Sequence, residues 1–349
     1  MKKIITFLFF IFLFRLSAEI PTGYYNTAVG KTEAALKTAL AGVVGVHTER
    51  TYSDLWTDFQ TTDKRTDGKV WDMYSNCTFT FGQNQDSGLG GNAECQYYNR
   101  EHSMPNSWFN KAYPMYSDLF HMYPTDKFVN NQRGNYPLGE TSSGTVFGNG
   151  SKLGTSSFAG YSGTVFEPIN EYKGDFARTY FYMVTAYDDK VANWVSDQLA
   201  GNQYPALSTW SVALFLKWNS LDQVSEKETN RNEAVYGIQH NRNPFIDHPE
   251  LAEFIWGSRK GELWSLTSGV DELKINFTIS PNPVRNEIRI STEESDISYS
   301  IYNLNGQLLQ ENNLNGNQVI SVDNLNNGMY LIQIRSGNCR TVQKFVVNH

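Results

Sequence analysis

The amino-acid sequence predicts an α+β fold in two parts: a mainly helical domain with short strands, followed by a small antiparallel β-sandwich domain. The chain has 349 residues, enough for about two domains of ~150 residues each. Apolar residues recur at helical spacing in several segments before residue 257. From residue 275 onward, short alternating strands are instead separated by Asn and Gly turns.

Residues 1–18 have the pattern of a secretory signal peptide. Two lysines precede a short apolar run that ends at the small residues Ser17 and Ala18. A membrane anchor is the alternative, but the run is shorter than the ~20 residues of a spanning helix, and Arg15 interrupts it. We expect cleavage after Ala18 and export through the periplasm. Loss of the two lysines and Arg15 would lower the formal net charge from −7 to −10.

Residues 19–257 are expected to form one helix-rich domain. Four stretches have apolar residues at helical spacing, namely residues 31–46, 175–187, 205–219 and 225–241. The last stretch opens with Ser225 and carries Glu228 three positions later, which is a capping-box pattern. The Gly-, Ser-, Thr- and Asn-rich residues 139–164 are expected to form a loop.

Residues 258–274 are expected to be a linker, and residues 275–349 the small β-domain. Alternating apolar positions predict strands at residues 288–290, 298–304, 306–310, 330–335 and 344–347. An ordinary β-sandwich that stabilises the first domain or binds a ligand is one interpretation of this part.

The three cysteines are too few for a disulfide scaffold. In an oxidising compartment, Cys77 and Cys95, which flank the Gly-rich residues 82–93, are expected to form a disulfide. Two buried free thiols are the alternative. Cys339 has no obvious partner, and the spacing of the cysteines supports no metal site.

Composition and charge exclude several classes of protein. With 40% hydrophobic, 14% aromatic and 19% charged residues, the chain is not disordered, collagen-like or a coiled coil. A mean hydropathy of −0.47 excludes a polytopic membrane protein. A sequence pI near 5.4 argues against a protein that coats nucleic acid through a broad basic surface. Nucleophile-elbow, P-loop, dinucleotide-binding and HExxH motifs are absent from the sequence.

The densest group of polar side chains lies between residues 98 and 140. A strand is expected to end at residue 102, a second strand to span residues 119–123, and a brief helix to begin at Asp126 and end near residue 133. This order would bring together an imidazole, a carboxylate, an amide and a guanidinium, from His102, Glu101, Asn130 and Arg133.

These four groups suit phosphodiester hydrolysis. One carboxylate and one amide oxygen, with several retained waters, suit Mg²⁺ better than zinc. A neutral histidine near pH 7 can deprotonate an attacking water, and an arginine can bind phosphate. The alternatives are a solvated histidine at a strand end and an asparagine that only forms a turn.

Three motifs in this region resemble the endonuclease I family of secreted bacterial nucleases, which carry a ββα-metal (His-Me finger) active site. They are Glu-His-x-x-Pro at 101–105, Asp-Leu-x-His-x-x-Pro at 118–124 and Val-Asn-x-x-Arg-x-Asn at 129–135. The resemblance continues through 167–183 and 217–251, so it covers nearly all of the first domain.

The resemblance implies roles for individual residues. His102 would be the general base, and Glu101 and Asn130 would hold Mg²⁺, with Ca²⁺ or Mn²⁺ as alternatives.

Three further residues would act on the substrate. Arg133 and Asn135 would bind phosphate or support the site. Arg242 would reach the nucleic-acid backbone, unless it only holds the last helix against the core. The arginine that stabilises the transition state would be Arg133 or Arg242.

The C-terminal part resembles the type A sorting domain of type IX secretion at residues 277–283, 301–309 and 325–335. This implies contact with the type IX secretion machinery, and a product that is either released or anchored at the cell surface.

The sequence therefore predicts a secreted, metal-dependent endonuclease that cleaves DNA, with RNA as a second substrate, with weak sequence preference and with 5′-phosphate products. We expect a monomer with no stable protein partner. Two rival hypotheses remain: a noncatalytic surface-displayed binding module on a nuclease fold, and a metal-dependent phosphatase.

Overall fold

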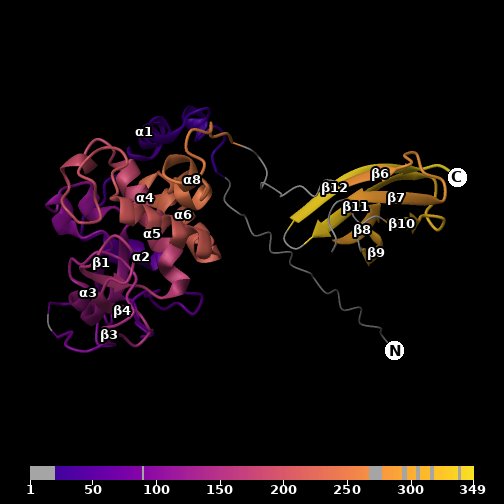
Figure 1. The fold of residues 1–349 in the computed structure, drawn as a ribbon. Coiled ribbons are helices and arrows are strands. Elements are labelled where there is room, and N and C mark those ends of the chain that lie inside the picture. Colours follow the sequence, from indigo (N-terminus) through magenta and orange to yellow (C-terminus); the bar gives the residue numbers. More distant parts are fainter. Residues whose placement is uncertain are drawn as a thin grey trace, which may run out of the picture. The chain divides into compact units, whose positions relative to one another are not determined.

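The chain divides into two compact units, Met1–Leu266 and Thr267–His349 (Figure 1). The computed structural model describes residues 20–266 apart from Leu89, and residues 277–349 apart from 293–296, 304–306, 315–317 and 337–338. Three predictions fall outside this description, namely the signal peptide at 1–18, the linker over 267–274 and the state of the Cys339 side chain. No helix in the described part of the chain is long and apolar enough to cross a membrane.

A buried helix, α4 (Lys173–Ala186), lies at the centre of the N-terminal unit (Figure 1). All of its residues after Lys173 are buried. Most of them are apolar or aromatic, and the charged residues Asp175 and Arg178 form ion pairs with Lys227 and Glu228, respectively. It packs against α1 (Glu33–Val44), α5 (Thr209–Leu221) and α7 (Pro244–Asp247). The helix predicted over 175–187 is confirmed.

The other predicted helices are present as well. The helix α6 (Glu226–Gln239) begins with the predicted capping box: the Glu228 N–H donates to Ser225 Oγ at 3.2 Å, and the Ser225 N–H donates to Glu228 Oε2 at 3.0 Å. The helix α5 starts four residues later than predicted, because Leu207 still pairs with Leu199 in a β-bridge. Three short helices in the described residues are additional, α2 (Leu55–Thr62), α7 and α8 (Leu251–Ile255).

Two strands and a short helix follow one another around the polar cluster. β1 (Tyr98–His102) pairs antiparallel with β2 (Met122–Asp126), and α3 (Lys127–Arg133) follows β2 directly. β2 begins three residues later than the strand predicted at 119–123 and runs through Pro124. Proline is tolerated there because each strand of a two-stranded ladder has one unpaired side.

Part of the segment predicted as a loop, residues 139–164, forms a small sheet. Its order is β3-β4-β5, with β3 (Thr145–Val146), β4 (Lys152–Thr155) and β5 (Thr164–Glu167). Strands this short, placed among Gly and Ser residues, have too few alternating positions to be recognised from the sequence.

The C-terminal unit consists of two antiparallel sheets that share one apolar core, with Ile288, Ile301 and Ile332 among its side chains. The sheet β10-β7-β6 contains β6 (Phe277–Ser280), β7 (Glu287–Thr292) and β10 (Gln318–Ser321). The sheet β12-β11-β8-β9 contains β8 (Ile297–Asn303), β9 (Leu308–Leu314), β11 (Gly328–Ser336) and β12 (Cys339–Val347). The predicted β-sandwich is confirmed, with β6 and β10 as additional strands.

The N-terminal unit extends past residue 257. Trp264, inside the segment expected to be a linker, is 1% exposed and packs in the N-terminal core. Its backbone N–H donates to the carbonyl of Lys31 at 3.0 Å, and its carbonyl accepts from Gly30 at 2.7 Å.

Candidate active site

β1 and α3 border a cavity of about 280 Å³. The described residues that line it are Tyr52, Asn99, Arg100, Glu101, His102, Pro105, Asn106, Asn130, Asn131, Gly134 and Asn135. Four of the residues singled out from the sequence therefore share one cavity: Glu101, His102, Asn130 and Asn135. Arg133 and Arg242, which were expected to act with them, are not among its lining residues.

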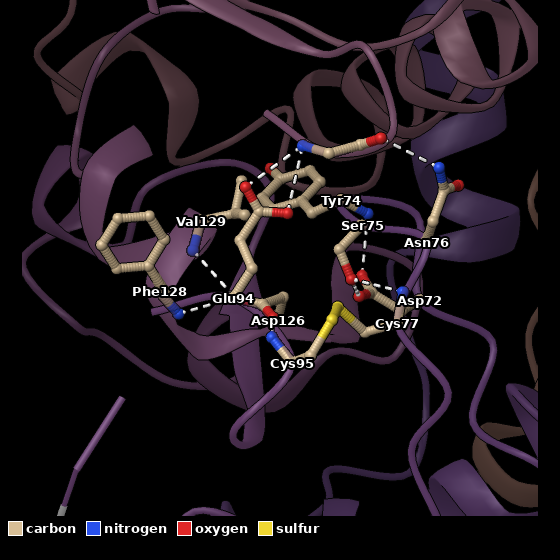
Figure 2. The surroundings of a disulfide bond; sticks show 11 residues. Asp72, Tyr74, Ser75, Asn76, Cys77, Glu94, Cys95, Asp126, Phe128 and Val129 are labelled. Carbon is tan, nitrogen blue, oxygen red and sulfur yellow. Dashed lines mark hydrogen bonds between the residues drawn. A yellow bond between two sulfur atoms is a disulfide. The ribbon is translucent and has the colours of Figure 1, made fainter. Parts of the chain in front are cut away.

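The start of α3 is fixed by Asp126, its N-cap residue. Asp126 Oδ1 accepts hydrogen bonds from the N–H groups of Phe128 (2.8 Å) and Val129 (3.0 Å), and Oδ2 accepts from the N–H of Cys95 (2.7 Å). Cys95 forms a disulfide with Cys77, as expected from the sequence (Figure 2). The loop that the disulfide closes is thereby tied to the helix that borders the cavity.

His102, at the end of β1, has a ring whose orientation is fixed on both sides. Nε2 lies 2.9 Å from the carbonyl oxygen of Tyr116, and Nδ1 lies 3.1 Å from the amide nitrogen of Asn106. A carbonyl oxygen only accepts and an amide nitrogen only donates, so Nε2 carries the proton and Nδ1 the lone pair. The Tyr52 ring stacks on the imidazole at a centroid distance of 5.7 Å. Burial lowers the pKa of His102 to about 3, so the ring is neutral at neutral pH.

Glu101 is 3% exposed and is held by two donors. Its Oε1 accepts from the Tyr74 hydroxyl at 2.9 Å and from Arg133 Nη1 at 2.7 Å. Burial raises the pKa of Glu101 to about 7, and the charge of Arg133 opposes that rise. A cation in the cavity would favour the ionised carboxylate in the same way.

Asn130 lies on α3 and also faces the cavity. Its Nδ2 donates to Asn99 Oδ1 at 2.8 Å. This bond orients the amide, so that the side-chain oxygen is the atom able to contact a cation. Asn135, which follows α3, is exposed and lines the same cavity.

The donor set of this cavity fits a hard divalent cation. Glu101 and Asn130 offer a carboxylate and an amide oxygen, which are ligands that Mg²⁺ prefers. Within the described residues, no group of three or more His, Cys, Asp or Glu side chains could hold a metal ion. A cation bound here would keep most of its ligands as water, which is typical of Mg²⁺ and not of zinc.

The geometry contradicts one of the two roles expected for Arg133, the binding of phosphate, and agrees with the other, which is support of the site. Its side chain is fully buried, and besides Glu101 it donates to the carbonyls of His102 (3.0 Å) and Ser103 (2.5 Å) and to the Tyr180 hydroxyl (3.4 Å). A guanidinium enclosed in this way cannot reach a phosphate. Arg133 is a positioning residue, which holds the Glu101 carboxylate and the end of β1.

The geometry also contradicts a contact between Arg242 and the nucleic-acid backbone. Arg242 is 2% exposed. Its Nε and Nη2 bind the Asp247 carboxylate at 2.6 and 2.8 Å, and Nη2 also binds Glu233. Because Glu233 lies on α6 and Asp247 on α7, Arg242 holds these two helices together. This was the alternative interpretation of the residue.

Seven of the described lining residues are missing from the sequence-based prediction, namely Tyr52, Asn99, Arg100, Pro105, Asn106, Asn131 and Gly134. Arg100 could have been found, because it lies two positions before His102 and therefore on the same face of β1. Tyr52 could not have been found, because it comes from a segment outside the motifs and meets His102 only through the tertiary fold.

Comparisons with known proteins match both units of the chain to known families. Residues 32–250 match the family model of Endonuclease I, and residues 278–348 match that of the secretion system C-terminal sorting domain. An extracellular ribonuclease of Bacillus amyloliquefaciens is 35% identical over 246 residues, which are 69% of this chain and 80% of that protein. An extracellular ribonuclease of Bacillus subtilis (strain 168) is 36% identical over 243 residues, 67% of this chain and 78% of that protein.

Two other similarities are weaker. Endonuclease-1 of Buchnera aphidicola subsp. Baizongia pistaciae (strain Bp) is 28% identical over 130 residues, 37% of this chain and 46% of that protein. The structure of PorZ, a surface component of the type IX secretion system of Porphyromonas gingivalis, aligns with 27% of this chain and 13% of its own at 16% identity. Its TM-score of 0.20 is too low to bear on the fold.

The family match covers more than half of the chain and includes every residue that lines the cavity. The sorting domain and the extracellular relatives agree that the protein is secreted or attached to the cell surface. The chain therefore belongs to the endonuclease I family of nucleases and carries a C-terminal sorting domain of type IX secretion.

Proposed function

We propose that this nuclease hydrolyses internal phosphodiester bonds of nucleic acid with water, with His102 as the general base and a divalent cation held by Glu101 and Asn130. One observation carries the proposal. A neutral histidine with its lone pair on Nδ1 shares a polar cavity with a carboxylate and an amide oxygen. The succession of β1, β2 and α3 beside this cavity supports the proposal of a ββα-metal site.

His102 is arranged to accept a proton at one atom. Because its Nε2–H is donated to Tyr116, Nδ1 is the basic atom. The attacking water takes the place of the Asn106 amide beside Nδ1 and gives its proton to the ring as its oxygen bonds to phosphorus. The bond from phosphorus to the leaving sugar oxygen then breaks, and this oxygen takes up a proton from solvent water. The charge of a bound phosphate favours the imidazolium, which offsets the effect of burial on the pKa.

When bound, a divalent cation supplies positive charge to the phosphate oxygens as negative charge develops on them. We propose Mg²⁺, with Ca²⁺ and Mn²⁺ as alternatives. Arg133 and Tyr74 hold one oxygen of Glu101 in place, and Asn99 orients the Asn130 amide. The chain thus fixes both oxygen ligands before substrate arrives.

The proposed substrate is DNA, with RNA as a second substrate. The related proteins named extracellular ribonucleases support cleavage of RNA. A formal net charge of −7 means that binding depends on local contacts and not on bulk attraction. We also propose that the protein acts as a monomer and reaches the exterior through the type IX machinery.

A comparison of three substrates tests the proposal. Plasmid DNA, RNA and a chromogenic phosphomonoester are incubated with the full chain in Mg²⁺, Ca²⁺, Mn²⁺ or EDTA. We expect cleavage of plasmid and RNA that EDTA abolishes, and no hydrolysis of the monoester. Hydrolysis of the monoester alone would indicate a phosphatase. Binding of plasmid without cleavage in every metal would indicate a noncatalytic module, and either outcome contradicts the proposal.

A further inference from the structure

Arg100 differs from the other arginines of the N-terminal unit. Each of the other seven arginines in residues 20–266 forms an ion pair with a carboxylate. These pairs are Arg50 with Asp58, Arg65 with Asp67, Arg133 with Glu101, Arg178 with Glu228, Arg231 with Asp63, Arg242 with Asp247 and Arg259 with Glu262. None of the ion pairs between described residues includes Arg100.

Aromatic rings hold Arg100 instead. Its guanidinium carbon lies 3.6 Å from the centroid of the Tyr52 ring and 4.3 Å from that of the Trp56 ring. Its Nη1 donates to the Tyr52 carbonyl at 2.5 Å. Stacking on ring faces fixes a guanidinium plane without neutralising its charge, and leaves N–H groups at its edge for another acceptor.

Arg100 is also well placed for an anionic ligand. Among the described residues that line the cavity, it is the one arginine, and no lysine accompanies it. It lies two residues before His102 on the same face of β1, and that spacing along a strand is roughly 6.5–7 Å. A fixed cation therefore lies next to the proposed general base.

We infer that Arg100 binds a phosphate group of the nucleic-acid backbone in the cavity, beside the bond that is cut. This inference rests on the proposed function, and it gives the site the phosphate-binding arginine that the buried Arg133 and Arg242 cannot be. The planar fork of a guanidinium matches two phosphate oxygens, and the contact is to the backbone, so it selects nucleic acid without selecting a sequence.

The salt dependence of binding tests this contact directly. Wild-type protein, Arg100→Gln and the control Arg65→Gln are titrated in EDTA with a fluorescein-labelled single-stranded DNA over a range of salt concentrations. Loss of one phosphate contact lowers the slope of log binding constant against log salt by about 0.7 for a single strand. We expect that decrease for Arg100→Gln, with a Kd raised roughly 10- to 100-fold at low salt, and wild-type values for Arg65→Gln.

An unchanged slope and Kd in Arg100→Gln, while wild type binds and cuts, would overturn the inference and leave the proposed function standing. Failure of the wild type to cut nucleic acid with any divalent cation would instead refute the proposed function. If tryptophan fluorescence shows that Arg100→Gln is unfolded, the variant Arg100→Lys tests the inference in its place. It keeps the charge but not the fork, so we expect a wild-type slope with a KM raised about 10-fold; an unchanged KM would overturn the inference.

Discussion

Replacement of Arg133 by methionine should destabilise the N-terminal unit strongly, because Arg133 supports the site from inside the core. Arg133→Met removes the partner of Glu101, a residue that is 3% exposed, and the donors to the carbonyls of His102 and Ser103. Breaking a buried ion pair by removal of one partner costs about 3–5 kcal/mol. The free energy of unfolding should fall by about that amount, a large part of the ~5–15 kcal/mol typical of a domain.

Urea unfolding of the full chain measures this change in the relevant unit. All eight tryptophans lie between residues 56 and 264, so tryptophan fluorescence reports on the N-terminal unit and not on the sorting domain. Arg65→Met is the matched control, because Arg65 forms an exposed pair with Asp67 and such pairs contribute about 0–1 kcal/mol. The double variant Glu101→Gln/Arg133→Met should regain part of the loss, because it leaves no buried charge without a partner.

A different result would refute this reasoning. If Arg133→Met unfolds within about 1 kcal/mol of wild type and instead raises KM for nucleic acid, Arg133 would not be a buried support. The original expectation that it contacts phosphate would then be correct.

Three further predictions concern other parts of the N-terminal unit. The disulfide joins residues 18 positions apart, so Cys77→Ala/Cys95→Ala should lose about 3 kcal/mol in the same urea assay; an unchanged midpoint would contradict this. Burial raises the pKa of Asp72 to about 7, whereas the ordinary pKa of an aspartate in the unfolded chain is ~3.9. Between these two pH values the native state keeps a proton that the unfolded chain has released. Stability should therefore fall as the pH rises from about 4 to about 7, and Asp72→Asn should flatten that part of the profile. Asn130→Ala should raise the Mg²⁺ concentration for half-maximal cleavage by roughly 10-fold or more, whereas an unchanged requirement would exclude Asn130 as a ligand.

The order of strands and helix along the sequence was enough to predict that Glu101, His102 and Asn130 lie together at one cavity. Glu101, His102 and Asn130 lie on two adjoining strands and the helix that follows, so neighbouring elements bring them together without information from the rest of the chain. The strands of the β-sandwich could be predicted for the same reason, because the alternation of apolar and polar residues within each segment is enough to recognise a strand.

The roles of the arginines could not be predicted in this way. Asn130 and Arg133 are three positions apart on α3, which suggests a shared face. Burial of the Arg133 side chain, which contacts Tyr180 of α4, depends on the tertiary fold. For Arg242 a local signal did exist, because Asp247 follows five residues later and binds it. The stacking of Arg100 on Tyr52 and Trp56 joins segments about 45 residues apart, which no local pattern reveals.

The central claim is that His102 is the general base of this nuclease. The most direct test is the rate of plasmid nicking in Mg²⁺ by wild type, His102→Ala and His240→Ala, the last being an exposed histidine at the end of α6. Loss of a general base lowers rates by about 10²–10⁴-fold. We expect a loss of that size in His102→Ala with tryptophan fluorescence unchanged, and the wild-type rate in His240→Ala. Nicking by folded His102→Ala at the wild-type rate would contradict the claim.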